Sequence, residues 1–157
     1  MSAEQSNHGA NREAVAEAIA ESFARQGLMG RLGAELLSVK PGEVDIRLPF
    51  SDGVSQQHGY FHAGAIASIA DSAAGYAGLS MAPIGMTALA VEFKINLMRP
   101  GVGDAVVAKG RVLRSGRQLS VCTAEVFIEE GGALTKQCAQ LQQTLVILPA
   151  DEGRPAG

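Results

Sequence analysis

The hydrophobic pattern begins with helical spacing. Between Glu13 and Gln26, apolar side chains recur every fourth residue from Val15 to Phe23, which is typical of an amphipathic helix. Asn11 is a suitable N-cap for this helix, and the glycine that follows Gln26 would end it. We expect the helix to lay one apolar stripe over the core.

Much of the remaining chain alternates between apolar and polar residues, which predicts strands. Within 43–49, Val44, Ile46 and Leu48 alternate with charged residues, so one face of this strand should be buried. The apolar residues from Leu89 to Leu97 alternate equally strictly with the residues between them. Glycine and proline residues mark turns between the strands. The predicted strands are Ala34–Val39, Glu43–Pro49, Thr87–Met98, Asp104–Arg114, Leu119–Glu130 and Ala133–Leu148.

A second helix is predicted from Ala63 to Ser80, and it is almost wholly apolar. A helix without a polar face must be covered on most sides. An antiparallel sheet that curls around it would provide this cover, which predicts an α+β fold. The many alanines of the helix also permit close approach by another backbone, and we expect a homodimer to supply it.

Composition narrows the class of protein. A chain of 157 residues with 46% hydrophobic and 18% charged residues suits one globular domain. We expect this domain at 11–148, with flexible ends at 1–10 and 149–157. The net charge of −3 gives no general attraction to nucleic acid. No uninterrupted apolar span or secretory signal is evident, which favours the cytoplasm. Cys122 and Cys138 form no metal or redox motif and are expected in the core.

Asp71 is the unusual residue of the apolar helix. Aspartate costs roughly 0.5 kcal/mol relative to alanine inside a helix, and burying an unpaired carboxylate costs several kcal/mol more. A solvent-facing stripe or a structural hydrogen bond would explain its presence. The small and apolar residues around it favour a third interpretation, a catalytic carboxylate in a dry cleft.

The start of the same helix offers a different kind of group. Its first N–H groups have no partner within the helix and carry partial positive charge. Gly64 has no side chain, so an oxyanion could approach its N–H closely. Asp71 lies nine positions after His62, or roughly 13 Å along the axis, so both groups cannot act on one substrate within one chain. A two-fold partner would bring them together, which predicts active sites shared between subunits.

The loop before this helix contains further polar candidates. The Gln56 amide can orient a water molecule or a polar substrate group, although a solvated loop residue is an equally ordinary interpretation. His62 is expected to fix the loop by hydrogen bonds. No His, Cys or carboxylate spacing typical of a metal site is found, and neither a nucleophile elbow nor a phosphate-binding glycine loop is present.

Together these residues resemble a known family. Gln56-x-x-Gly59-x-x-His62-Ala63-Gly64, followed by Ile69-Ala70-Asp71, is similar to the motif of hotdog-fold acyl-CoA thioesterases of the PaaI-like and THEM-type subfamily. The strand Ala90–Pro100 is similar to the first long strand of these enzymes. The resemblance covers about residues 32–147 and carries little information about the acyl group.

The resemblance implies a hotdog fold, an antiparallel β-sheet wrapped around one central α-helix, and hydrolysis of acyl-CoA to a carboxylic acid and CoA. It makes Asp71 the nucleophile or the general base for water. The Gly64 N–H of the facing subunit would polarise the thioester carbonyl. Gln56 would orient water or substrate and His62 would hold the loop. Two departures are Ala63, in place of the first glycine of a pair, and Ala90, where some relatives carry a water-positioning serine.

The implied substrate carries phosphates, for which arginine is well suited. The predicted CoA contacts are Arg114, Gly116, Arg117 and Asn96, although ordinary solvated turn residues would give the same pattern. No separate cofactor is expected, because CoA is part of the substrate. The resemblance also implies dimers and a dimer of dimers, that is, a homotetramer. Two other classes stay open: a dehydratase or hydratase on the same fold, and a non-catalytic acyl-CoA sensor.

Overall fold

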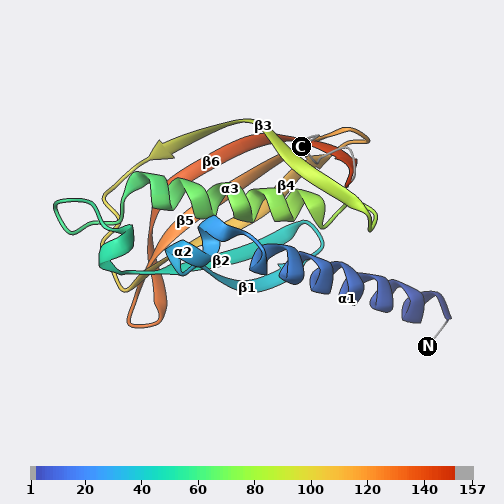
Figure 1. Ribbon diagram of the computed structural model, residues 1–157, viewed down its shortest axis with the longest axis horizontal. Helices are drawn as coiled ribbons and strands as arrows, with labels where there is room; N and C mark the ends of the chain where they lie inside the picture. The colour runs from blue at the N-terminus through green and yellow to red at the C-terminus, as the bar shows by residue number, and fades with distance from the viewer. Residues whose placement is uncertain (1–2, 151–157) are drawn as a thin grey trace.

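The chain folds as one long curved sheet around a central helix (Figure 1). A computed structural model describes residues 3–150. The helices are α1 (Ala3–Ala24), α2 (Gly27–Leu32) and α3 (Ala63–Leu79), with a 3-10 turn at Asp52–Val54. The strands are β1 (Glu35–Lys40), β2 (Glu43–Pro49), β3 (Met86–Leu97), β4 (Ala105–Ser115), β5 (Leu119–Glu130) and β6 (Ala133–Pro149).

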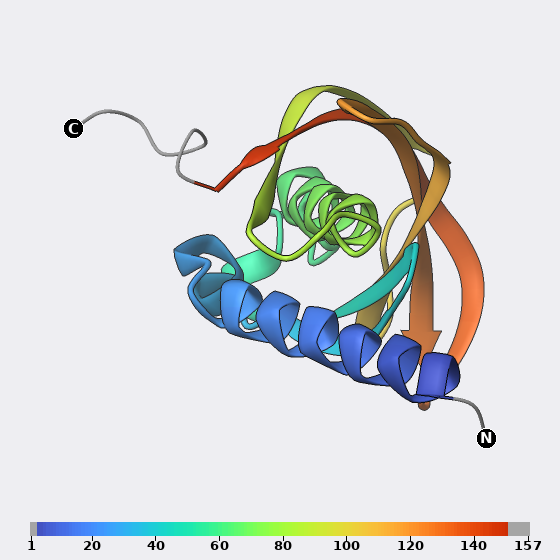
Figure 2. The same ribbon diagram turned by 90° about the vertical axis from the view of Figure 1, so that its right-hand side faces the viewer.

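The sheet has six antiparallel strands in the order β1-β2-β4-β5-β6-β3. Viewed end-on, it curves in an arc around α3 (Figure 2). The helix α1 lies outside this arc and packs on the side of β1. As predicted, the molecule is an antiparallel sheet wrapped around one apolar helix.

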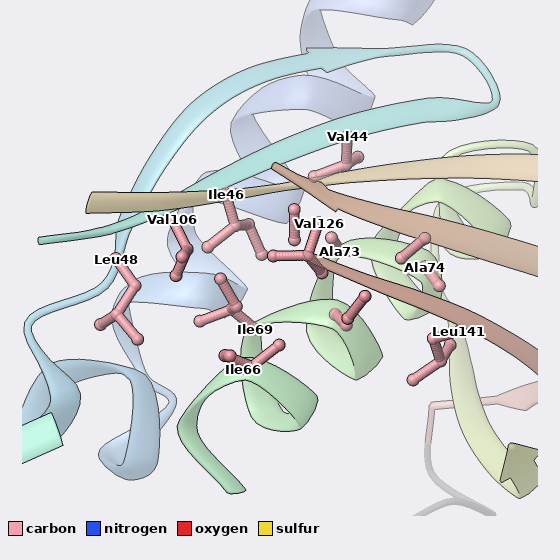
Figure 3. Close-up of a cluster of buried hydrophobic side chains, with 14 of the residues drawn as sticks. Val44, Ile46, Leu48, Ile66, Ile69, Ala73, Ala74, Val106, Val126 and Leu141 are labelled. Carbon is pink, nitrogen blue, oxygen red and sulfur yellow. The ribbon is translucent and has the colours of Figure 1, made fainter. Parts of the chain in front are cut away.

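The core fills the space between α3 and the concave face of the sheet (Figure 3). The alternation predicted for β2 is confirmed, because Val44, Ile46 and Leu48 are fully buried and point toward the helix. Ile66 and Ile69 of α3 meet them. Burying each such side chain stabilises the fold by about 1.5–3 kcal/mol. This packing fixes the rotation of α3 about its axis, and therefore the direction in which its polar residues point.

The alanines of α3 pack against the chain's own sheet, which corrects the expectation that a second chain covers them. Ala70, Ala73 and Ala74 are fully buried. At Gly110 of β4 the two backbones approach so closely that an added Cβ would lie 2.2 Å from the Ala73 carbonyl oxygen. A curled sheet surrounds a helix more completely than a flat one would, so the small residues are used within the subunit.

The N-terminal helices also differ from the prediction. The helix α1 begins at Ala3 instead of after Asn11, because the residues before Asn11 include several strong helix formers. The predicted flexible ends fall partly outside the described residues. The short helix α2 was not predicted, since six residues with two glycines show no periodicity, and burial of Met29 holds it. None of the described helices combines the length and apolar composition needed to cross a membrane.

The strand β3 lies at the edge of the sheet and breaks its alternation with a bulge between Ala90 and Glu92. Leu89 pairs with Val146 on the outer face of the sheet, whereas Phe93 pairs with Gln143 on the inner face. The strict alternation in the sequence therefore does not place all the apolar residues of this strand on one face. The added residue of a bulge shifts the side-chain parity, which the sequence pattern alone does not reveal.

Candidate active site

Asp71 lies on the side of α3 that faces β3 and β6, where it borders a cavity of about 210 Å³. The carboxyl group is half-buried, and this burial raises its pKa above the usual range for aspartate. The cavity has several polar side chains in its lining, so it is not the dry cleft expected from the sequence, and a catalytic role for the carboxylate stays a prediction. The cavity is lined by Ser22, Gln26, Asp71, Ser72, Gly75, Tyr76, Leu79, Thr87, Ala88, Ala90, Gln143 and Leu145.

Gln143 reaches Asp71 from β6, and sequence reasoning missed it. Its side chain is fully buried. In the amide orientation that satisfies both of its groups, Nε2 donates to Asp71 Oδ1 at 2.9 Å and Oε1 accepts from the Gly75 N–H at 3.1 Å. In the opposite orientation the amide oxygen would face the carboxylate. The available signal was a glutamine between Leu141 and Leu145 on the apolar face of the last strand.

A chain of hydrogen bonds forms another wall of the cavity. The Tyr76 hydroxyl donates to Ser22 Oγ and accepts from Gln26 Nε2, both at 3.1 Å. The Ser72 hydroxyl donates to Gln26 Oε1 at 3.2 Å. These bonds join the end of α1 and the residues after it to α3, beside Asp71. Sequence reasoning missed this wall as well, because serine, tyrosine and glutamine at these spacings resemble ordinary surface residues.

The start of α3 forms a separate polar group. The Gly64 N–H is exposed and donates to Nδ1 of His62, the N-cap residue, at 2.9 Å. Gln56 Oε1 accepts from the His58 N–H, and the Gln56 backbone N–H donates to the Tyr60 carbonyl at 2.8 Å. The His62 side chain therefore caps α3, and its backbone N–H holds the loop by donating to the Val54 carbonyl at 2.8 Å. The Gln56 side chain bonds within the loop, and a loop-holding role for the His62 side chain stays a prediction. Gln56 also lines a second cavity, with Ala63 and Leu97 among its neighbours.

Within one chain, the structure does not bring Asp71 and Gly64 together. Seven positions separate them on α3, which corresponds to about 10 Å along the helix axis. They also belong to different surroundings, because Asp71 borders the cavity against β6 and Gly64 lies at the exposed start of the helix. This separation agrees with the distance argument made from the sequence.

The four predicted CoA contacts do not form one surface within the subunit. Arg114, Gly116 and Arg117 are exposed at the hairpin between β4 and β5. Leu119 at the hairpin and Leu89 of β3 both pair with Val146, so the hairpin lies at the level of Leu89. Asn96 is exposed seven residues further along β3, about 20 Å away. None of the four borders the cavity at Asp71.

Within the part of the chain that the structure describes, the other titratable and metal-ligating side chains form no second centre. Both cysteines are buried, and burial raises the pKa of Cys122 and of Cys138 to about 11, as expected of core thiols. Among the residues that the structure describes, no group of three or more His, Cys, Asp or Glu side chains is placed to hold a metal ion.

An antiparallel sheet that curls around a long central helix is the hotdog architecture. Solved structures agree with this assignment. A thioesterase family protein from Silicibacter pomeroyi matches with a TM-score of 0.80 and 36% identity, over 84% of this chain and 96% of that one. The PaaI protein of Escherichia coli shares the fold with a TM-score of 0.73 at 24% identity, over 85% of this chain and 93% of PaaI.

Sequence comparison leads to the same family. Residues 58–135 match the model of the thioesterase superfamily. The acyl-coenzyme A thioesterase PaaI of Escherichia coli is 30% identical over 100 residues, which is 63% of this chain and 69% of PaaI. The chain therefore belongs to the thioesterase superfamily as a PaaI-like hotdog protein.

Proposed function

We propose that this protein is an acyl-CoA thioesterase. Water adds its oxygen to the acyl carbon, the carbon–sulfur bond breaks, and the products are a carboxylic acid and the free thiol of CoA. The observation that carries the proposal is the half-buried carboxylate of Asp71 at a cavity between α3 and the sheet, in a chain of the thioesterase superfamily. The related PaaI protein of Escherichia coli is an acyl-coenzyme A thioesterase, which supports CoA as the thiol.

Asp71 performs the first step in one of two ways. As a general base it takes a proton from a water molecule that attacks the thioester carbonyl. As a nucleophile it attacks the carbonyl carbon itself, the carbon–sulfur bond breaks as the CoA thiolate leaves, and water then hydrolyses the resulting anhydride. Both routes need the ionised carboxylate, and the raised pKa makes it a stronger base than an exposed aspartate.

The thioester oxygen needs a hydrogen-bond donor while negative charge develops on it. We assign this role to the Gly64 N–H of the partner subunit. In the free protein His62 Nδ1 accepts this N–H and keeps it directed out of the helix end. The substrate oxygen replaces the imidazole as acceptor, and Gln56 lies nearby to orient water or the acyl group.

The edge strand β3 is the surface through which we propose that the dimer forms. Its apolar side chains are unusually exposed: 43% for Leu89, 60% for Val91 and 47% for Phe93. A long, apolar, unpaired edge is a template for pairing with another strand. A second copy of this chain suits the edge, because antiparallel pairing of two β3 strands about a two-fold axis extends the sheet without new chemistry.

The position of the axis follows from the two cavities. Ala90 borders the same cavity as Asp71, and Leu97 borders the same cavity as Ala63 at the start of α3. An axis between them, close to Phe93, places each Asp71 opposite Gly64 of the partner subunit. Association of two such dimers into a homotetramer is part of the proposal. Arg114, Gly116 and Arg117 at the β4–β5 hairpin are the proposed contacts for the CoA nucleotide, with phosphate pairing from the two arginines. Asn96, about 20 Å away within one subunit, is proposed to join them from the partner subunit.

A thiol-release assay over acyl-CoAs of varied chain length and aromaticity tests the function. The unmodified protein should release thiol from at least one of them, and Asp71→Asn should lose at least about 100-fold in kcat. Asp52→Asn, the same change at an exposed loop residue, is the matched control and should retain activity. Tight binding of acyl-CoA without thiol release would instead favour the non-catalytic sensor.

A further inference from the structure

Gln143 joins two groups of α3 that lie one helical turn apart. Its amide donates to the Asp71 carboxylate and accepts from the Gly75 backbone, so both ends of the amide are used. A fully buried amide on an otherwise apolar strand face would be costly without such partners. Among the side chains that the structure describes, Gln143 is the only one that donates a hydrogen bond to the Asp71 carboxylate.

We propose that Gln143 is a positioning residue for thioester hydrolysis, which holds Oδ1 of Asp71 against the sheet and leaves Oδ2 free for the reacting water or thioester. This inference rests on the function proposed above. The Gly75 contact makes the arrangement rigid, because the amide cannot rotate without losing its bond to the helix backbone. Gln143 therefore determines which carboxylate oxygen reacts and in which direction it points.

The hydrogen bond also favours the charged form of Asp71. Burial alone disfavours the carboxylate, whereas an N–H donated to it has the opposite effect. The other titratable group that borders the cavity is Tyr76, whose pKa is raised by burial, so it stays neutral near pH 7. Arg25 acts on Tyr76 from the end of α1. The neighbours from β3 and β6 carry no charge: Thr87, Ala88, Ala90 and Leu145.

The substitution Gln143→Met tests this role, because methionine has a similar length and no N–H donor. We expect kcat near neutral pH to fall about 10- to 100-fold, with KM little changed. The acidic limb of the kcat profile should move to higher pH by about one unit, because Asp71 loses a donor to its charged form. Gln142→Met is the matched control, since Gln142 is the exposed neighbour on β6. It should leave kcat and the acidic limb of its pH profile unchanged.

The substitution Gln143→Glu provides a second test that does not depend on the methionine variant. Its carboxyl group can donate to Asp71 only while protonated, so the two groups titrate as a pair. The kcat profile should become bell-shaped, with activity lost on the alkaline side. A normal pH profile and a normal kcat in both folded variants would overturn the inference and leave Gln143 a packing residue.

A readout without substrate separates this inference from the proposed function. The pKa of Asp71 can be followed by carbon-13 NMR of its carboxyl group in the free protein. It should be higher in Gln143→Met than in the unmodified protein, and an unchanged pKa would overturn the inference. If no acyl-CoA is hydrolysed by the unmodified protein, the proposed function fails whatever this titration shows.

Discussion

At the scale of the residue, Asp71 is held in a position that lowers stability. Burial disfavours its charge, and the hydrogen bond from Gln143 offsets part of that cost. A carboxylate kept in such surroundings is expected where the chemistry needs a strong base. The pH dependence of stability should therefore reveal Asp71 independently of any substrate.

We predict that Asp71→Asn increases the free energy of unfolding near pH 7. The folded-state pKa of Asp71 lies above its unfolded value of about 3.9, so the folded protein binds the proton more tightly. The stability that this tighter proton binding contributes is fully present below the unfolded-state pKa of Asp71. It is lost as the pH rises through the folded-state pKa. The asparagine amide does not titrate, so the variant loses no stability as the pH rises. The excess stability of the variant over the unmodified protein should therefore disappear on acidification to about pH 3. Urea unfolding at several pH values measures this, and a less stable variant at pH 7 would contradict it.

At the scale of the element, the pattern of the sequence predicts most of the fold. The helix α3 and all six strands lie within a residue or two of their predicted limits, because alternation and glycine or proline turns are local signals. The bulge in β3 and the helix α2 were missed, since tertiary packing determines both.

The candidate site was predicted only in part for the same reason. Asp71 was identifiable because a carboxylate in an apolar helix conflicts with its local surroundings. Gln143 gave no comparable signal, because its contact joins residues 72 positions apart and depends on which strand packs beside α3. The packing of α3 on its own sheet likewise depends on tertiary structure, which the sequence pattern does not reveal.

We predict that Gly110→Ala is strongly destabilising. The new Cβ would lie 2.2 Å from the Ala73 carbonyl oxygen, so α3 and β4 must move apart. Overpacking of this kind costs about 1–3 kcal/mol, and more where backbone is in contact. Gly30→Ala is the matched control, because a Cβ there meets nothing within 4 Å. Chemical denaturation of both variants measures the difference, and equal stabilities would refute the close contact.

At the scale of the whole molecule, the proposed mechanism requires two subunits. One chain holds Asp71 and Gly64 about 10 Å apart along α3, and it leaves the apolar edge of β3 uncovered. The proposed two-fold pairing of β3 would resolve both features. Assembly and activity should therefore be lost together.

We predict that Val91→Lys weakens the dimer and reduces thioesterase activity in parallel. Val91 is 60% exposed on β3, and a charge placed at a paired edge must be desolvated. Leu28→Lys makes the same kind of change at an exposed residue of α2 and should preserve both properties. Sedimentation measures the dimer, and a thiol-release assay measures the activity. A monomer with full activity would show that the site is complete in one chain.

Subunit complementation tests the central claim most directly. Asp71→Asn removes the carboxylate, and Gly64→Pro removes the N–H donor in the first helical turn, where proline is tolerated. Each variant alone should be inactive. When the two are unfolded and refolded together in equal amounts, about half of the dimers are mixed, and each mixed dimer has one intact site. The account predicts recovery of about a quarter of the unmodified activity, whereas a mixture as inactive as its parents would contradict it.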